Sequence, residues 1–317
     1  DTGLNVGSSI HQEFDGPGKI LPGPDYVNDD MDPSDDHGHG THVAGIVAAE
    51  ADGLGIVGIA PEATLMPVKV LNAFGVGVTS DVTMGIDYAV VSGAKVINLS
   101  LGSNPFANLP GVLDFDFMYE NSLRHAEARG VVVVVAAGND HCSLPGKPAS
   151  YANVINVAAL TQDDRLTEFS NYGPEVTLAA PGYWMYSAMI GQPDNYFFAS
   201  GTSQAAPVVA GVVALLLQKD PALTPRQVKD ILEATADDLG PPGRDDFYGF
   251  GRVNAARALG LTPAVSAIPA LLSIEVVPDK IVATFSKDML ADGSANAVNN
   301  FNNVRWLIAP ELDAFMT

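Results

Sequence analysis

"VVVVVAAG", residues 131–138, is an apolar run with no charged or polar side chain. A strand with one solvated face alternates apolar and polar residues, so this run predicts a strand that is buried on both faces. Strands of that kind are typical of parallel sheets covered by helices on either side. Residues 121–130, directly before the run, predict a helix that ends in glycine. The two segments together indicate a helix–strand unit of an α/β domain.

Further segments of both kinds follow in either direction along the chain. We expect strands at 94–102, 131–138, 153–160 and 175–182, and helices at 80–93, 121–130, 203–220 and 224–236. Strands interspersed with helices in this way predict an α/β domain with a mostly parallel central sheet flanked by helices.

The pattern changes near residue 258, which we take as the end of this domain. Residues 259–270 have the composition of a linker. In 271–290, β-branched residues lie on both sides of a "PDK" turn, which predicts a hairpin. Residues 271–317 are therefore interpreted as part of an all-β module.

Composition limits the classes of function. The chain has 317 residues, 47% of them hydrophobic, which is enough for a large core. It carries 16 Lys and Arg against 37 Asp and Glu, a formal charge of -21, and this excess argues against a nucleic-acid partner. A solvated acidic surface is the plain interpretation, with salt adaptation and calcium binding as alternatives. No uncharged apolar run reaches the roughly 18 residues of a membrane span, and the single cysteine, Cys142, excludes an internal disulfide.

"HGHGTHVAG", residues 37–45, holds three of the six histidines. They are either a metal cluster or a single general base with two bystanders. The zincin pattern H-E-x-x-H is absent, which disfavours zinc. A histidine base needs a carboxylate on one ring nitrogen and a nucleophile near the other. "DTGLN" at 1–5 offers the carboxylate of Asp1, and "ASGTSQAAPVVAG" at 199–211 offers Ser203 at the mouth of an apolar helix, where developing negative charge is favoured.

"DTG", "HGTHVAG" and "GTSQAAP", in this order, resemble the three catalytic signatures of the subtilisin-like serine proteases, or subtilases. The resemblance covers residues 1 to about 258 and implies a three-layer subtilisin-like fold. It implies that Asp1 orients the imidazole, that His39 is the base and that Ser203 is the nucleophile. Asn139 in "AAGND" matches the asparagine of the oxyanion hole, with a turn asparagine as the alternative. His42 would then be structural, and His37 would lie in an exposed loop.

The resemblance also suggests how an extended peptide substrate binds. "SLG" at 100–102 matches the segment that pairs with substrate, and "GVG" at 75–77 would form the opposite wall. Val82 and Leu101 would line the pocket for the fourth residue before the cut and favour an apolar side chain there, unless both are core residues. The implied substrate-binding residues are Gly75, Gly77, Val82, Ser100, Leu101, Gly102 and Gly138.

Two loops resemble calcium sites of the family, and calcium prefers oxygen ligands. The loop 49–58 matches a strong calcium loop, with Asp52 giving its side chain, Glu50, Leu54 and Ile56 their carbonyls, and Glu13 a further carboxylate. Residues 25–42 match the loop of thermitase-like relatives, with Asp25, Asp30 and Asp32 as ligands. A solvated acidic loop is the alternative for this second stretch.

The remaining expectations follow from the family as a whole. The resemblance implies a secreted or cell-surface endopeptidase of broad specificity, monomeric, acting on proteins or peptides, and made with a signal peptide and an inhibitory propeptide that lie outside this sequence. It also implies a strand ahead of Asp1, so we expect these 317 residues alone to be weakly active or misfolded. Residues 271–317 resemble the start of a bacterial Ig-like module. A non-catalytic binding module and a metal-dependent hydrolase are the competing hypotheses.

Overall fold

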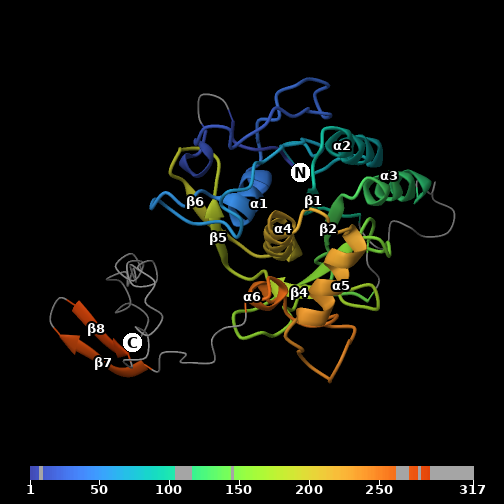
Figure 1. Ribbon diagram of the computed structural model, residues 1–317. Coiled ribbons are helices and arrows are strands. Elements are labelled where there is room, and N and C mark those ends of the chain that lie inside the picture. The colour runs from blue at the N-terminus through green and yellow to red at the C-terminus, as the bar shows by residue number, and fades with distance from the viewer. Residues whose placement is uncertain (7–9, 104–115, 144–145, 262–270, 278–279, 286–317) are drawn as a thin grey trace. The chain divides into compact units, whose positions relative to one another are not determined.

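The computed structural model describes residues 1–6, 10–103, 116–143, 146–261, 271–277 and 280–285 (Figure 1). The chain divides into two compact units, Asp1–Leu261 and Thr262–Thr317. This division lies close to the boundary predicted at residue 258. The first unit contains every predicted site residue, and each unit is described by itself.

The centre of the first unit is a four-stranded parallel sheet. Its strands lie in the order β1 (Val96–Leu99), β2 (Val132–Ala136), β3 (Ile155–Leu160) and β4 (Leu178–Pro181), and each is parallel to its neighbour. The prediction of a parallel sheet is therefore confirmed. The sequence-predicted strands are longer by a few residues because their ends continue into loops.

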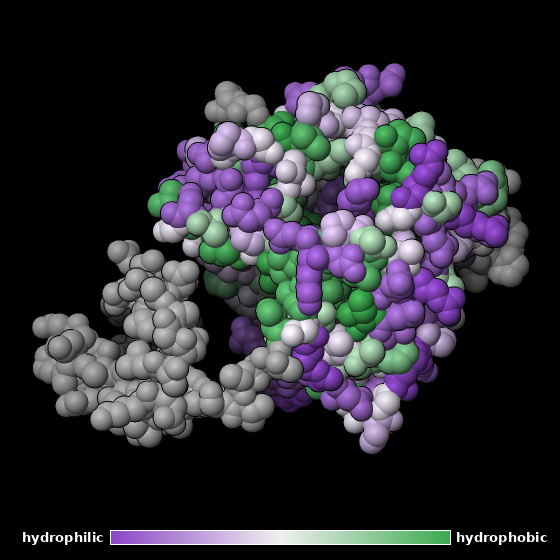
Figure 2. All heavy atoms as spheres, viewed as in Figure 1, coloured by the Kyte–Doolittle hydropathy of each residue, from purple (hydrophilic) through white to green (hydrophobic). Residues whose placement is uncertain are grey.

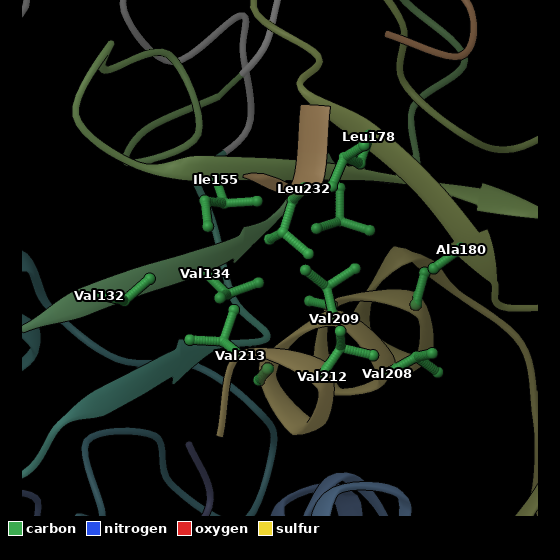
Figure 3. Close-up of a cluster of buried hydrophobic side chains, with 14 of the residues drawn as sticks. Val132, Val134, Ile155, Leu178, Ala180, Val208, Val209, Val212, Val213 and Leu232 are labelled. Atoms are coloured by element: carbon green, nitrogen blue, oxygen red, sulfur yellow. The ribbon is translucent and has the colours of Figure 1, made fainter. Parts of the chain in front are cut away.

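Strand β2 is buried along its whole length because helices cover both faces of the sheet. Val132 and Val134 point to one face and share a core with α4 (Thr202–Lys219) and α5 (Pro225–Thr235), as Figure 3 shows. Val133 and Val135 point to the other face and share a core with α2 (Thr79–Val91) and α3 (Asp116–Ala128). The alternation of period two thus divides one valine run between two cores.

Sequence patterns set the ends of several helices. α5 begins at Pro225 behind a capping box, in which Thr224 and Gln227 satisfy each other's backbone N–H groups. α1 (His39–Ala48) begins on the second histidine of "HGHGTHVAG". A short 3-10 helix, η2, spans Gln12–Phe14, and α6 spans Ala255–Ala258. Helix α3 begins before the predicted residue 121.

An antiparallel hairpin of β5 (Met185–Ala188) and β6 (Tyr196–Ala199) was not predicted from the sequence. Its outer face carries exposed aromatic rings, among them Trp184 and Phe198. Its inner face holds α1, because the Ser187 hydroxyl donates to the carbonyl of His42 over 2.7 Å. The hairpin therefore helps to fix the helix that carries His39.

In the second unit, β7 (Leu271–Val277) and β8 (Lys280–Phe285) form an antiparallel pair in which Val277 is opposite Lys280. The hairpin predicted around "PDK" is confirmed. Residues 286–317, which include most of the segment predicted to be Ig-like, lie outside the described residues.

Hydrophilic side chains cover much of the face in Figure 2, which accords with the net charge of -21. A hollow opens in this face near the point marked N in Figure 1. Among the described helices, none is both long and apolar enough to cross a bilayer.

Candidate active site

Loops at the carboxyl ends of two neighbouring strands hold part of the site. Ser100 follows β1 directly, and Asn139 lies three residues after the end of β2. Since these strands are parallel, both residues leave the same edge of the sheet, where sites of α/β proteins form. Ser203 stands in the first turn of α4 and His39 in the first turn of α1.

Asp1 and His39 form a direct pair. The imidazole Nδ1 lies 2.8 Å from Asp1 Oδ1, which also accepts the N–H of Thr2 over 2.7 Å. Because a carboxylate can only accept, Nδ1 carries the proton. The lone pair of a neutral ring is therefore on Nε2, as a general base requires.

Burial keeps this imidazole neutral. Desolvation is the largest cause that lowers the pKa of His39, to about 4, and the positive charge of the Asp1 amino group adds to it, while Asp35 acts to raise the pKa. The amino group is itself buried, and its pKa falls to about 5. At neutral pH the ring is free to accept a proton.

Ser203 is held by Ser100 at two points. The Ser203 hydroxyl donates to the Ser100 carbonyl over 3.2 Å, and the Ser100 hydroxyl donates to the Ser203 carbonyl over 2.7 Å. That second carbonyl is available because Pro207, four residues along α4, has no N–H to donate to it. No hydrogen bond joins Ser203 to His39 among the residues described.

Asn139 offers its amide NH₂ beside Ser203. Its Oδ1 accepts the backbone N–H of Thr202 over 2.9 Å and the Thr202 hydroxyl over 3.1 Å. With the oxygen occupied, the orientation of the amide is fixed and Nδ2 faces away from Thr202. No protein acceptor for Nδ2 is found within the described part of the chain, so this donor is available to a ligand.

A cavity of about 250 Å³ adjoins these groups. Ser203 and Asn139 line it, together with Leu101, Gly102 and Gly138 from the predicted substrate-binding set. The predicted site residues therefore provide a partly buried neutral imidazole, and a serine at a helix N-terminus and a free amide donor that share a pocket.

The family model for subtilases matches residues 1–251. The chain belongs to the subtilase family. It is 41% identical over 260 residues to a thermophilic serine proteinase of Bacillus sp. (strain AK1), a match that covers 82% of this chain and 60% of the relative. It is 40% identical to thermitase of Thermoactinomyces vulgaris, with 82% and 86% covered, and 39% identical to subtilisin BL of Lederbergia lenta, with 80% and 88% covered.

Solved structures agree with the sequence relatives. A crystal structure of a cold adapted subtilisin-like serine proteinase has 33% sequence identity and a TM-score of 0.67, covering 80% of this chain and 84% of that one. The expected subtilisin-like fold is therefore confirmed, and the class of enzyme is that of the serine-type endopeptidases.

The other predicted substrate residues of this subtilase lie at different depths. Gly75 and Gly77 are exposed in the loop before α2, and Gly75 has φ +70°. Ser100 is buried beneath Ser203. Val82 is buried at 4% exposure in the core that α2 forms with β1 and β2, which agrees with the core alternative.

The three histidines of the stretch 37–42 have separate environments. His42 is buried, and its Nε2 lies 3.2 Å from the carbonyl of Met185 and 3.1 Å from that of Phe197, so it ties α1 to the β5–β6 hairpin. His37 is exposed. In the described ranges no group of three His, Cys, Asp or Glu side chains is arranged to hold a metal ion.

Glu13 is the best placed of the predicted calcium ligands. It is 1% exposed, and its Oε1 accepts the N–H of Ile56 over 2.9 Å and the hydroxyl of Tyr196. Its Oε2 is buried without a hydrogen-bond partner. Burial raises the pKa of Glu13, these two hydrogen bonds lower it, and the charges of Asp52 and Glu50 raise it further. A hard cation in the loop would satisfy the unpartnered oxygen and relieve that repulsion.

The second acidic loop is organised by its own backbone. The Asp25 carboxylate accepts the N–H groups of Val27 and Asn28 and the Asn28 amide, over 2.7, 3.0 and 2.8 Å. Asp30 accepts the N–H of Asp32 over 2.8 Å, and Asp32 accepts that of Ser34 over 3.2 Å. Asx-type turns account for these contacts without a metal, so a calcium role of the three aspartates stays a prediction.

Two residues of the site were not found from the sequence. Thr202 orients Asn139 and accepts the N–H of Gly138 over 3.0 Å. Asp35 contacts the first turn of α1. Thr202 was within a quoted motif, and Asp35 was one acid among several in a loop, so only their three-dimensional contacts distinguish them.

Proposed function

We propose that this subtilase hydrolyses peptide bonds through Asp1, His39 and Ser203. The observation that carries the proposal is the 2.8 Å contact between Asp1 and His39, because it leaves a neutral Nε2 as the only basic nitrogen of the ring. Catalytic hydrogen bonds are often long or absent before substrate binds. A Ser203 hydroxyl on the Ser100 carbonyl is thus compatible with a nucleophile at rest.

In the first step, Ser203 Oγ bonds to the carbonyl carbon of the substrate while its proton passes to His39 Nε2. The carbonyl π electrons move to the oxygen and give a tetrahedral oxyanion. As the C–N bond breaks, His39 returns the proton to the leaving amine. Water then repeats the sequence on the acyl-enzyme and releases the acid and free Ser203. Asp1 stabilises the imidazolium that forms in each half.

The oxyanion has two donors in this proposal. One is Nδ2 of Asn139, oriented by Thr202. The other is the N–H of Ser203, which lies in the first turn of α4, where helical N–H groups have no intrahelical acceptor. The positive end of the helix dipole favours negative charge at the same place.

The substrate class is proposed to be extended protein or peptide chains of broad sequence. An extended segment can pair with the backbone at 100–102 and 75–77, and the cavity beside Leu101, Gly102 and Gly138 would take a side chain. We infer an apolar preference at the fourth residue before the cut, through Leu101. The resemblance to subtilisins further supports an extracellular monomer that is made with an inhibitory propeptide.

The first prediction tests the nucleophile and the subsite together. A fluorophosphonate probe should label the wild-type chain and leave Ser203→Ala unlabelled, while the nearby exposed Ser200→Ala stays labelled. On a peptide library, wild type should enrich apolar residues four positions before the cut, and Leu101→Ala should weaken that enrichment. Folded wild type that resists the probe would refute the serine mechanism, whereas a library without enrichment would refute only the subsite.

We also propose that calcium binds the loop 50–56 together with Glu13 and stabilises the fold. Glu13 and Asp52 would supply carboxylate oxygens, and Glu50, Leu54 and Ile56 carbonyl oxygens. The unpartnered Glu13 Oε2 supports this assignment. Calcium would supply positive charge to a buried carboxylate and would take no part in peptide hydrolysis.

The second prediction measures this by thermal unfolding. A hundredfold excess of calcium over its Kd adds about 2.7 kcal/mol, or about 5–10 °C in Tm for a domain of this size. Glu13→Gln should lose most of that rise, because the amide removes the charge. Asp163→Asn, which alters an exposed acid paired with Arg165, should keep it. An equal calcium-dependent rise in both variants would exclude Glu13 as a ligand.

A further inference from the structure

The Asp35 carboxylate accepts several hydrogen bonds, although the proposed steps of hydrolysis do not use it. Its Oδ1 takes the hydroxyl of Thr2 over 2.9 Å and the N–H groups of His37 and Gly38 over 3.0 and 2.8 Å. Its Oδ2 takes the N–H and the hydroxyl of Thr41 over 2.9 and 2.7 Å. Five donors thus converge on one partly exposed carboxylate, which fills its lone pairs.

These donors come from the two segments that carry the Asp1–His39 pair. Thr2 follows Asp1, and its hydroxyl oxygen also accepts the N–H of Gly40 over 2.8 Å. Thr41 is in the first turn of α1, and its hydroxyl oxygen also accepts the N–H of Asn5 over 3.0 Å. Asp35 is therefore the common acceptor of a network that joins residues 1–5 to the helix of His39.

The same carboxylate replaces a missing cap of α1. The N-cap position is Gly38 at φ +100°, which has no side chain to offer. The first-turn N–H groups of a helix have no intrahelical acceptor, and here Thr2 satisfies that of Gly40 while Asp35 satisfies that of Thr41. A negative charge at this end also suits the helix dipole.

From this network we propose that Asp35 is a positioning residue for the subtilase reaction: its carboxylate sets the separation and orientation of the His39 ring relative to Asp1. The inference rests on the proposed function of that pair. Asp35 acts through Thr2 and Thr41 and does not touch substrate. Without it, both segments lose an acceptor and the ring and the carboxylate are free to separate.

The pKa of His39 offers a second measurement that tests the role of Asp35. The charged and titratable groups around the His39 ring are the Asp1 carboxylate and amino group, Asp35, His37 with ring centroids 6.3 Å apart, and His42 further along α1. Among them Asp35 favours the imidazolium. Removing its charge should therefore lower the pKa of His39, whereas a loosening of the fold that admits water should raise it.

The third prediction compares Asp35→Asn with Asp29→Asn, which removes an equal charge from the same acidic stretch at an exposed position with φ +59°, a conformation that asparagine tolerates. Asp35→Asn should lower kcat by about 10- to 100-fold, with KM nearly unchanged, and shift the His39 titration seen by NMR to lower pH. Asp29→Asn should match wild type in both measurements.

A double-mutant cycle separates positioning from general damage. In the Asp1→Asn background, Asp35→Asn should cost less than about threefold, because the pair that it positions is already broken. If the fold-losses of kcat in the two single variants multiply in the double variant, the proposal is wrong.

A second variant is used if Asp35→Asn does not fold. Thr2→Val, which removes one donor to Asp35, must then show the same pattern of kcat, and Thr2→Ser must restore kcat, or the proposal fails. If activity depends on Ser203 and His39 but Asp35→Asn keeps the wild-type kcat, this inference alone is refuted. If Ser203→Ala keeps the wild-type kcat, the proposed function is refuted.

Discussion

Asn139→Ala should lower kcat by about 10²–10³-fold and leave KM nearly unchanged, as removal of one oxyanion donor does in subtilisin, from which this magnitude is taken. The physical reason is that Nδ2 would bind the oxygen only after it becomes negative, so its loss raises the barrier without weakening substrate binding. Steady-state kinetics on a peptide ester and a peptide amide would measure both constants.

A second variant tests whether the loss acts through Thr202 instead. Asn139→Asp keeps an oxygen for the N–H and hydroxyl of Thr202 but presents a negative oxygen where the donor was. It should be at least as impaired as Asn139→Ala. If Asn139→Asp restored kcat, the role of Asn139 would be to hold Thr202, and the oxyanion assignment would be wrong. Asn153→Ala, at a partly exposed asparagine near Glu127, should behave as wild type.

An apolar extension of five or six residues ahead of Asp1 should raise Tm by roughly 10 °C. A cavity of about 540 Å³ lies between the edge of β1 and residues 63–68, under α1, α2 and α4. Asp1 stands at its end, where its amino group donates to the carbonyl of Val68 over 3.2 Å and its carbonyl accepts the N–H groups of Val70 and Leu71. A chain continued backwards from Asp1 could enter this cavity beside β1.

The size of this effect follows from burial. Five apolar side chains gain about 1.5–3 kcal/mol each, against about 1.5 kcal/mol per residue for ordering the chain, which leaves a few kcal/mol. At about 2–4 °C per kcal/mol, that is on the order of 10 °C. Activity should also rise, because a strand on this side would hold the Asp1 carboxylate against His39. Calorimetry and kinetics on the extended chain would measure both.

The control is a Gly-Ser extension of equal length, which removes the free amino group of Asp1 in the same way but buries no apolar surface. It should leave Tm near the value of the unextended chain. Equal gains from both extensions would show that the amino group, whose pKa burial lowers to about 5, was the whole cause. No gain from either would mean that the cavity does not accept a strand.

The residues proposed to be catalytic could be named from the sequence because each lies in a local pattern. "DTG", "HGTHVAG" and "GTSQAAP" are short and occur in a fixed order, and Asn139 follows a valine run whose end is visible in the sequence. The helices at 203–220 and 224–236 were placed within a residue or two because apolar spacing, Thr224 and Pro225 mark them locally. The β5–β6 hairpin was missed because its exposed aromatic face has no clear alternation.

By itself, then, the sequence determined the parallel α/β architecture and the family, and it supplied the residues that we propose for the chemistry, since apolar period and local motifs depend only on near neighbours along the chain. Tertiary structure alone decided that Asp35 ties Asp1 to His39, that Thr202 aims Asn139 across 63 positions, and that Glu13 has a buried oxygen without a partner. These features depend on which donors and acceptors meet after segments far apart in the chain have packed. A hydrogen bond needs its donor and acceptor within about 3.5 Å. A local sequence pattern does not tell which residues from distant segments come that close.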